Sequence, residues 1–396
     1  MRDVGTVVRG IRTPIIKEGD DLANIVVDSV IKASESEKFS FEDKDVIAVT
    51  EAVVGISEGN FATLDQIALD VKNKLNSEHI GIVFPILSRN RFAVLLSAFA
   101  RSTKKITLLS SYPSDEVGND ILYREDLIKN NVNISSDLIS ESEYVEKYSH
   151  FKHLFTGVNM YEVYRDLVIK EGCEFEMVFS NNPEDILKYT NTIIACDIHT
   201  RYETKERILK NGDAKVLLLS DILNESVNGS GYSPYGLLGS NRSTEEKVKL
   251  FPRTGNELVH KIQDIMFEKT GKKVEVMVYG DGAFKDPVGK IWELADPVVS
   301  PAYTEGLEGS PNEIKLKYFS ENKFKDLSGD ELKEKMIEEI RNKDKELKGT
   351  MATQGTTPRR YTDLIGSLCD LTSGSGDKGT PVVWVKGYFK NYADEA

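Results

Sequence analysis

The chain of 396 residues is poor in cysteine and contains no long apolar run. Its three cysteines, Cys173, Cys196 and Cys369, are odd in number and widely spaced, which argues against a disulfide framework and a structural zinc site. No stretch of roughly 18 or more apolar residues occurs, so no membrane-spanning helix is predicted. Residues 1–21 are charged and lack the apolar core of a secretory signal. These absences favour a cytoplasmic protein with no membrane partner.

Positive charge is scarce as well. Lys and Arg number 51 against 64 Asp and Glu, which gives a net charge of −13. Nucleic-acid binding requires a basic surface, so a nucleic-acid partner is not expected. A local basic pocket for a small-molecule anionic substrate is still compatible with this balance. Only five histidines occur, and His150 and His153 have helical spacing, but no second cluster completes a metal site.

What the chain does contain is an ordinary globular composition, with 40% apolar and 29% charged residues. Five short apolar runs in its middle part alternate with helical patterns, which is typical of a doubly wound parallel sheet. These runs are residues 80–87, 105–109, 174–179, 192–196 and 214–219. We therefore predict a Rossmann-like α/β domain at residues 78–226.

Further strand patterns lie before and after this middle part. They are residues 4–8, 45–50, 274–279 and 381–385. Residues 53–55 (VVG) are expected to continue the second of these strands. A chain of this length is expected to form two or three domains, so the flanking segments have to belong to at least one domain besides the parallel-sheet domain.

Two polar segments follow predicted strands of the middle part. Ser88-Arg89-Asn90-Arg91 comes after the first run and opens a helix. A helix N-terminus with two arginines, at the carboxyl end of a parallel strand, suits a small anion. A capped helix with solvated arginines is the alternative, and the sequence does not separate the two. Asp197 and His199 end the fourth run and are a weaker acid–base candidate.

Three segments of the C-terminal half are candidates for phosphate, carboxylate or metal contacts. Residues 373–379 (SGSGDKG) are rich in glycine, which lets backbone N–H groups approach phosphate oxygens, and Lys378 adds charge; a flexible loop is the alternative. Asp281 lies between two glycines at a strand end, where it binds a hard cation such as Mg²⁺ or satisfies its own turn. Arg359 and Arg360 are a third candidate, for phosphate or carboxylate.

Several blocks, in this order, resemble the coenzyme F420-0:γ-glutamyl ligase family. They are residues 10–22 (GIRTPIIKEGDDL), 43–59 (DKDVIAVTEAVVGISEG), 276–281 (VMVYGD) and 371–387 (LTSGSGDKGTPVVWVKG). The first block is fairly specific, and the others matter by their order. The resemblance implies a discontinuous ligase-like α/β domain from residues 1–77 and 227–396, with the Rossmann-like domain at 78–226 inserted in it.

Proteins of this family use GTP and Mg²⁺ or Mn²⁺ to convert a carboxylate into an acyl phosphate, which the amine of L-glutamate attacks. The resemblance implies a metal ligand at Asp281 and a homodimer. It places the nucleotide on two segments of this chain, namely Thr13, Pro14, Ile15, Ile16, Gly374, Ser375, Gly376, Asp377 and Lys378. Ser88, Arg89, Asn90 and Arg91 are left as the predicted contacts of the anionic substrate.

The chain also departs from the family pattern. Gly55 and Ile56 stand where the family usually has Ser and Lys, and Leu238 stands where it has a metal-binding Asp. Two alternatives to a glutamate ligase therefore stay open. One is a ligand-binding or regulatory protein that kept the fold without the GTP step. The other is a different enzyme in the crevice of the inserted domain, which requires residues 88–91 and Asp197 to face one pocket.

Overall fold

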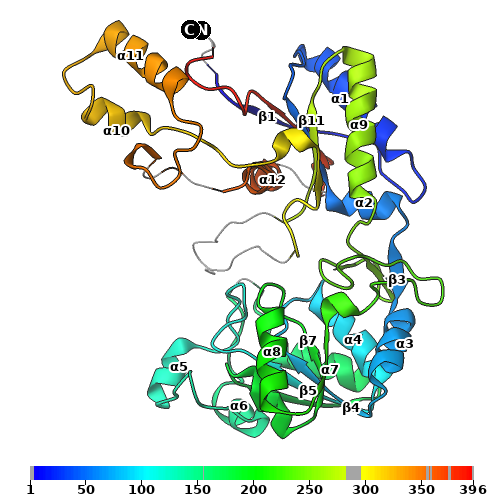
Figure 1. The fold of residues 1–396 in the computed structure, drawn as a ribbon. Helices are drawn as coiled ribbons and strands as arrows, with labels where there is room; N and C mark the ends of the chain where they lie inside the picture. Colours follow the sequence, from blue (N-terminus) through cyan, green and yellow to red (C-terminus); the bar gives the residue numbers. More distant parts are fainter. Residues whose placement is uncertain are drawn as a thin grey trace.

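The computed structural model describes residues 4–154, 156–281, 296–353, 356, 359–372 and 376–394. These residues form two lobes, each built on a five-stranded sheet (Figure 1). We call them the mixed-sheet lobe and the parallel-sheet lobe. Helices flank both sheets, and the predicted α/β fold class is confirmed.

The mixed sheet joins strands from both ends of the chain. Its order is β1 (Val7–Ile11), β13 (Val382–Lys386), β2 (Val46–Thr50), β11 (Glu275–Tyr279) and β12 (Ala302–Tyr303). β2 and β11 are parallel and pair Thr50 with Tyr279. β13 is antiparallel to β1 and β2 and pairs Val382 with both Ile11 and Val49. The ends of β1, β2 and β11 and the start of β13 therefore meet at one edge of the sheet.

Side chains of the mixed sheet alternate between two apolar layers. One layer contains Trp384, which is fully buried, and packs against α1 (Leu22–Glu37) and α9 (Gly255–Thr270). The opposite layer contains Val383 and packs against α12 (Tyr361–Thr372). Since both layers are covered, the edges of the sheet are what remain for loops and ligands.

The parallel sheet lies wholly within the predicted middle part of the chain. Its strands are β4 (His79–Val83), β5 (Lys105–Ser110), β6 (Glu174–Phe179), β7 (Thr192–Ala195) and β8 (Lys215–Leu218). Their order is β6-β5-β4-β7-β8, and every neighbouring pair is parallel, which confirms the predicted parallel sheet. The direction of winding reverses between β4 and β7, the place where such sheets usually hold ligands.

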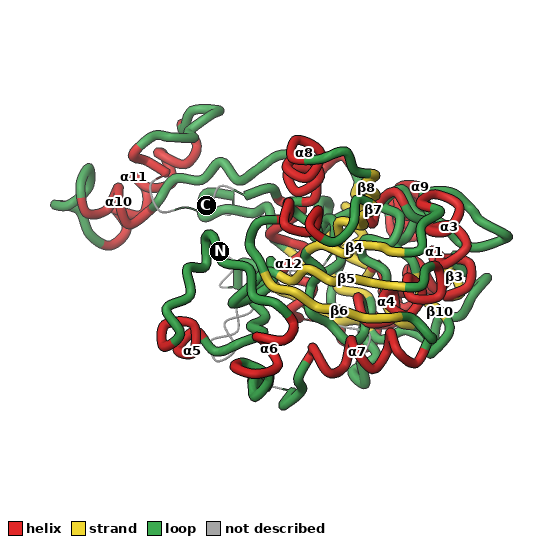
Figure 2. Tube along the Cα trace, turned by 90° about the horizontal axis from the view of Figure 1, so that it is seen from below, coloured by secondary structure: helices red, strands yellow, loops and turns green. Residues whose placement is uncertain are grey.

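Helices cover both faces of the parallel sheet (Figure 2). The larger apolar cluster packs five of them on one face, namely α3 (Leu64–Leu75), α4 (Phe92–Ser102), α5 (Arg124–Lys129), α6 (Glu141–Lys147) and α7 (Met160–Lys170). A smaller cluster on the other face packs α8 (Arg201–Asn211) and the 3₁₀ helix η1 (Pro183–Lys188).

A small sheet lies where the chain passes between the lobes. Its order is β3 (Phe61–Thr63), β10 (Lys247–Lys249) and β9 (Asn241–Arg242). The apolar cluster beneath α3 and α4 continues into Leu238 and Val248. Packing around the parallel sheet thus extends beyond residues 78–226, and independent folding of that segment stays a prediction.

One predicted strand is wrong. Residues 53–55 belong to α2 (Glu51–Ser57), which begins directly after β2. Val53 and Val54 are both buried, as the inner face of a short helix allows. An apolar run this short does not distinguish a buried strand from a helix, so the pattern alone was insufficient.

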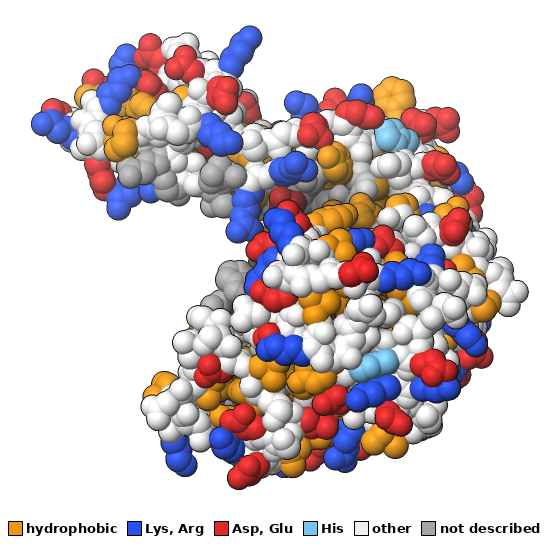
Figure 3. All heavy atoms as spheres, turned by 60° about the horizontal axis from the view of Figure 1, so that its bottom comes forward, with side chains coloured by type: hydrophobic (Ala, Val, Ile, Leu, Met, Phe, Trp, Pro, Cys, Tyr) orange, Lys and Arg blue, Asp and Glu red, His pale blue; other side chains and the backbone are white. Residues whose placement is uncertain are grey.

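An arm extends from the mixed-sheet lobe (Figures 1 and 2). It contains α10 (Leu316–Glu321) and α11 (Gly329–Asn342), and Ile337 and Ile340 pack there with Ala393. Between the arm and the parallel-sheet lobe the surface is hollowed (Figure 3). Within the described part of the chain, none of the helices has both the length and the apolarity needed to cross a bilayer.

Candidate functional site

Five charged side chains meet between the two lobes. They are Glu51 at the start of α2, Arg91 directly before α4, Lys249 on β10, and Asp281 and Asp296, which follow β11 in the chain. We call this set the junction cluster. Four of its side chains are at most 16% exposed, and Asp281 is 33% exposed. It contains three carboxylates and two cations.

Arg91 holds two carboxylates of the other lobe. Its Nη1 donates to Asp296 Oδ1 at 2.9 Å, and its Nη2 donates to Asp281. The backbone N–H of Asp281 also donates to Asp296 Oδ2 at 2.7 Å. Burial alone would lower the pKa of Arg91, but the charges of Asp296 and Asp281 outweigh burial and raise it. Gly280 is required here, because a Cβ at that position would lie 2.2 Å from Asp296 Oδ2.

Glu51 and Lys249 form a buried ion pair beside Arg91. Burial raises the pKa of Glu51, Lys249 opposes that rise, and Asp296 adds to it. The lysine side chain reaches Glu51 by passing Gly55, since a Cβ on Gly55 would lie 3.4 Å from Lys249 Cδ. Gly55 therefore leaves space for a cation that arrives from a distant strand.

Two predicted nucleotide-binding segments converge. Thr13, Pro14 and Lys378 line one cleft of about 1050 Å³ at the edge of the mixed sheet. The backbone N–H of Thr13 donates to Gly379 O at 3.4 Å, which joins the two segments. The cleft also contains the basic side chains of Arg9, Arg12 and Lys32.

The other predicted nucleotide contacts differ in their placement. Ile15 is 87% exposed, whereas Ile16 is buried in the apolar layer with α1. Gly376 and Asp377 directly precede Lys378 in the chain. Gly374 and Ser375 lie outside the described residues.

The turn at the end of the second family-like block, residues 57–59, has a structural role. Glu58 accepts hydrogen bonds from the backbone N–H of Arg253 and Thr254, at 3.1 and 3.0 Å, and from the Thr254 hydroxyl at 2.6 Å. A carboxylate at this place holds the start of α9 and satisfies donors at the helix N-terminus. The first block contacts the same turn, because Gly19 N–H donates to Ser57 O at 3.0 Å.

The four residues of the predicted substrate segment do not form one surface. Ser88 Oγ accepts from Phe92 N–H at 2.8 Å and fixes the start of α4. Asn90 O accepts from the N–H of Arg242 at 2.8 Å, Arg89 is exposed, and Arg91 belongs to the junction cluster. Only Arg91 is thus brought to the place where both lobes meet.

A second cavity tests the inserted-crevice alternative. Ser88, Arg91 and Cys196 line about 30 Å³, which is space for about one water molecule. Asp197 accepts hydrogen bonds from the hydroxyls of Thr200 and Thr204, both at 2.7 Å. Among the described residues, Asp197 does not line this cavity with Ser88 and Arg91.

Carboxylates organise the loops at the carboxyl ends of β5 and β7. Glu116 accepts from the N–H groups of Ile198, His199 and Thr200 at 2.7, 2.6 and 3.1 Å. Asp115 accepts from four donors on Leu87, Val117 and Asn119. Burial raises the pKa of Asp115 to about 6 in spite of these hydrogen bonds. The two side chains fix the loops that face the mixed-sheet lobe.

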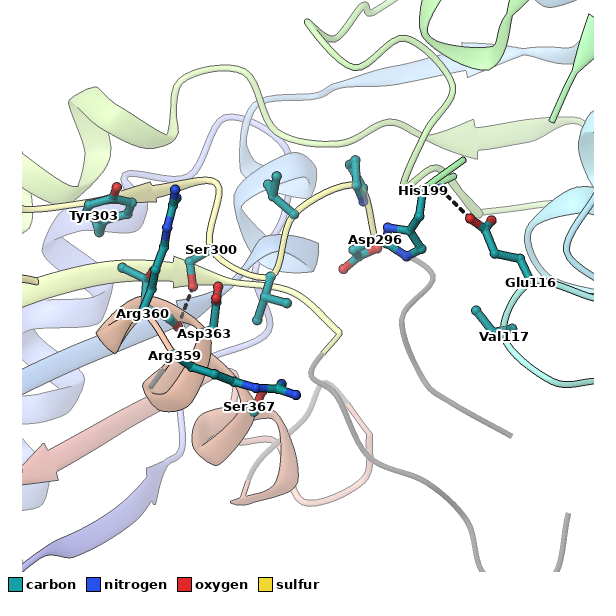
Figure 4. A pocket seen from close by; sticks show the side chains of 14 residues that line it. Glu116, Val117, His199, Asp296, Ser300, Tyr303, Arg359, Arg360, Asp363 and Ser367 are labelled. Carbon is teal, nitrogen blue, oxygen red and sulfur yellow. Dashed lines mark hydrogen bonds between the residues drawn. The ribbon is translucent and has the colours of Figure 1, made fainter. Parts of the chain in front are cut away.

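A larger pocket of about 520 Å³ has walls from both lobes (Figure 4). Glu116 and His199 contribute from the parallel-sheet lobe, and Arg359, Arg360 and Asp296 contribute from the other lobe. Two weaker sequence candidates, His199 and the arginine pair, are thereby brought to one place.

The sequence did not indicate Glu51, Lys249 or Asp296. Glu51 directly follows an apolar strand, which is the one local signal that was available. The partners lie far apart in the chain: Lys249 and Glu51 are 198 positions apart, and Arg91 and Asp296 are 205 positions apart. Single-residue patterns carry no information about such pairs.

Asp281 and Asp296 offer the hard oxygen donors that Mg²⁺ and Mn²⁺ prefer. The described residues contain no group of three or more His, Cys, Asp or Glu side chains placed to hold a metal ion. Leu238, which the sequence resemblance aligned with a metal-binding Asp, is 1% exposed within an apolar cluster. Two carboxylates suit a cation that also binds phosphate oxygens.

A comparison with protein families gives one match for this chain. The family model described as F420-0:Gamma-glutamyl ligase matches residues 10–387. The match includes the first-block residues, the junction cluster and the segment at Lys378. No curated protein matches the chain.

Proposed function

Because the chain belongs to the F420-0:Gamma-glutamyl ligase family, we propose that it joins L-glutamate to a carboxylate of a cofactor-like substrate through an acyl phosphate. The observation that carries the proposal is the convergence of Thr13, Pro14 and Lys378 on one cleft at the edge of the mixed sheet. GTP is the proposed phosphoryl donor and Mg²⁺ or Mn²⁺ the proposed cation. A homodimer is the proposed assembly.

The cleft has the properties that a nucleoside triphosphate needs. Its volume of about 1050 Å³ is at the upper end of ordinary small-molecule sites. Arg12 and Lys378 provide positive charge, and neither forms an ion pair with another described residue. Phosphate oxygens supply the missing partners, which supports a nucleotide there.

The junction cluster is the proposed place of phosphoryl transfer. Asp281 and Asp296 would hold the divalent cation, which neutralises charge on the transferred phosphoryl group. Arg91 keeps the two carboxylates together and adds a fixed positive charge nearby. Walls from both lobes limit the access of water to an acyl phosphate, which would otherwise hydrolyse.

The function is tested with F420-0 as the carboxylate substrate, GTP, Mn²⁺ and L-glutamate. We expect GDP and a glutamylated product in equal amounts, and no product when any one component is left out. Hydroxylamine in place of L-glutamate should trap the acyl phosphate as a hydroxamate. GDP release that is independent of F420-0, with no amide and no hydroxamate, would contradict the ligase proposal.

A ligand-binding protein without the GTP step is the second candidate. It is favoured by Leu238, an apolar core residue at the position that the resemblance assigns to a metal ligand, and by Arg91, which already binds Asp281 and Asp296. Calorimetry with GTP, with and without Mn²⁺, separates the candidates when it is combined with the product assay. Binding of F420-0 with no nucleotide turnover would support the second one.

A further inference from the structure

We propose that Arg91 is an internal cation in the site of Asp281 and Asp296, and that Mg²⁺ or Mn²⁺ binds these carboxylates only by displacing it. The inference rests on the proposed function, which assigns the divalent cation to the same two side chains. It adds that the metal ion and Arg91 exclude each other, so that filling the site breaks the ion pairs that Arg91 forms between the lobes.

The guanidinium of Arg91 already occupies the oxygens that a divalent cation needs. Its Nη1 donates to Asp296 Oδ1 at 2.9 Å, and its Nη2 donates to Asp281 Oδ2. The other oxygen of Asp296 accepts from the backbone N–H of Asp281 at 2.7 Å. Mg²⁺ lies about 2.0–2.1 Å from its oxygen ligands, so an ion on these oxygens would lie next to the guanidinium, which is always charged. Two cations that close repel each other strongly where little water is present.

The contacts of Arg91 cross from one lobe to the other and are poorly solvated. Arg91 directly precedes α4 in the parallel-sheet lobe, whereas Asp281 and Asp296 follow β11 in the mixed-sheet lobe. The side chains of Arg91 and Asp296 are 16% and 1% exposed. Asp296 nevertheless lines the pocket of about 520 Å³ that has walls from both lobes (Figure 4), so a ligand that enters between the lobes can reach it. A metal ion that takes this route meets Arg91 on its ligands.

A small cavity next to Arg91 offers the displaced side chain a second position. Arg91 and Ser240 both line this cavity of about 30 Å³. Ser240 is 2% exposed, and its hydroxyl oxygen has no hydrogen-bond partner among the residues that the structure describes. A buried hydroxyl without a partner lowers stability, and this one can accept an N–H of the guanidinium when the Arg91 side chain turns into the cavity.

Displacement by a metal ion alone is unfavourable, because Arg91 would stay buried after losing two carboxylates. Phosphate oxygens are strong partners for a guanidinium and are also ligands of Mg²⁺. A cation that arrives with a phosphate group therefore compensates Arg91, whereas a free cation does not. We expect the unmodified protein to bind Mn²⁺ weakly by itself and more tightly with GTP.

Binding of Mn²⁺ to the full-length protein without nucleotide is the first test, measured by electron paramagnetic resonance of free Mn²⁺. Arg91→Gln should bind Mn²⁺ about tenfold to hundredfold more tightly than the unmodified protein, because two charged hydrogen bonds no longer compete for the carboxylates. Arg165→Gln on α7 removes the same charge from an exposed side chain and should leave the affinity unchanged. The double variant Arg91→Gln/Asp281→Asn should lose the gain. Arg91→Lys, whose ammonium group lacks the paired geometry of a guanidinium, should show a smaller gain.

A Mn²⁺ affinity of folded Arg91→Gln that is equal to or weaker than that of the unmodified protein would overturn the inference, since Arg91 would then not compete with the metal ion. A gain that survives Asp281→Asn would overturn it too, because it would place Mn²⁺ elsewhere. If Arg91→Gln does not fold, an unchanged affinity in Arg91→Lys has the same meaning. None of these measurements involves turnover, so failure of the ligase proposal shows separately, as absence of product in the assay with F420-0.

Fluorescence energy transfer between the lobes is the second test. The three cysteines of the chain are buried, so labels can be placed on Tyr202→Cys in α8 and Phe267→Cys in α9, which are both exposed positions. Mg²⁺ with a non-hydrolysable GTP analogue should change the transfer efficiency, and Arg91→Gln should show the changed value without either ligand. A transfer efficiency that is the same in all of these states would overturn the loss of the ion pairs between the lobes.

Discussion

The two lobes bring different kinds of loop to their common junction. In the parallel-sheet lobe, groups of the same lobe donate hydrogen bonds to the loop carboxylates. Asp115 accepts four hydrogen bonds, and Glu116 accepts three from backbone N–H groups. In the mixed-sheet lobe Arg12, Lys378 and Arg359 form no ion pair with any described residue. Groups of the same lobe hold these two carboxylates, whereas the three cations of the mixed-sheet lobe have no ion-pair partner among the described residues.

Arg91 differs from the loop carboxylates of its own lobe, because its ion-pair partners belong to the other lobe. It belongs to the loop after β4, but its partners Asp281 and Asp296 belong to the mixed-sheet lobe. This difference supports the proposed function, in which the parallel-sheet lobe would fix the position of the junction and the mixed-sheet lobe would bind the ligands. Variants that act on only one lobe test this difference.

The largest expected effect is on the folding of the parallel-sheet lobe alone. The loop carboxylates of this lobe are hydrogen-bonded within the lobe, so a fragment of residues 60–251 should fold. This fragment keeps α3, Leu238 and Val248 with the rest of their apolar cluster. A fragment of residues 78–226 lacks these groups and should have a lower midpoint or no cooperative transition. Thermal unfolding followed by circular dichroism measures both.

The shorter fragment serves as the matched comparison. Equal stability of the two fragments would show that the cluster beyond residues 78–226 adds nothing and that the predicted boundaries are sufficient. Disorder in both fragments would mean that the parallel-sheet lobe folds only together with the mixed-sheet lobe. It would contradict separate roles for the two lobes.

A large effect is also expected from the buried pair at the junction. Lys249→Met leaves Glu51 buried without its cation, which should lower the free energy of unfolding by about 3–5 kcal/mol. The double variant Glu51→Gln/Lys249→Met removes both charges and should recover most of the loss. Urea unfolding of the full chain measures this. Lys104→Met breaks an exposed pair with Glu78 and should cost less than about 1 kcal/mol; equal losses for the two lysines would argue that the junction pair is effectively solvated.

The strands of both sheets were largely predictable because each is a short run that is buried as a unit. The five runs of the parallel sheet are strands within a few residues of the expected bounds, although the first ends at Val83, four residues before the apolar run does. The strands β3, β9 and β10 have two or three residues each, and a run this short carries no periodic signal.

The site was predictable only where it is local in sequence. Glycines and a lysine near residue 378, and an Asp between glycines at residue 281, are visible in the chain. The cation that reaches Glu51 is not visible, because it arrives from β10 by tertiary packing. Arg91 was identified as a cation at a helix start, but its partners are set by how the lobes meet.

A pH effect should appear in the parallel-sheet lobe. Because the folded-state pKa of Asp115 is raised from 3.8 to about 6, the folded protein binds more protons than the unfolded chain between these values. Stability from this group is therefore present below about pH 4 and is lost as pH rises to about 6, by roughly 3 kcal/mol. Asp115→Asn should remove this slope.

The measurement is the free energy of unfolding at several pH values from 4 to 7, for the unmodified protein and for Asp115→Asn. Burial also raises the pKa of Asp45 to about 6, so part of the slope should remain in the variant. Identical slopes in both proteins would show that water reaches Asp115 and that burial does not raise its pKa.

The smallest expected effect is on the mixed-sheet lobe, at Asp281. Asp281→Asn removes one of two carboxylates from the proposed cation site, so the affinity for Mn²⁺ in the presence of GTP should fall about tenfold, and less in its absence. The fold should be nearly unaffected, because Asp281 is 33% exposed and Arg91 keeps Asp296 as its partner. Electron paramagnetic resonance of free Mn²⁺ measures the affinity, and urea unfolding provides the control. A folded variant with unchanged Mn²⁺ affinity would remove Asp281 from the cation site and leave it as a partner of Arg91 alone, so that both lobes would then supply only structural charges to the junction.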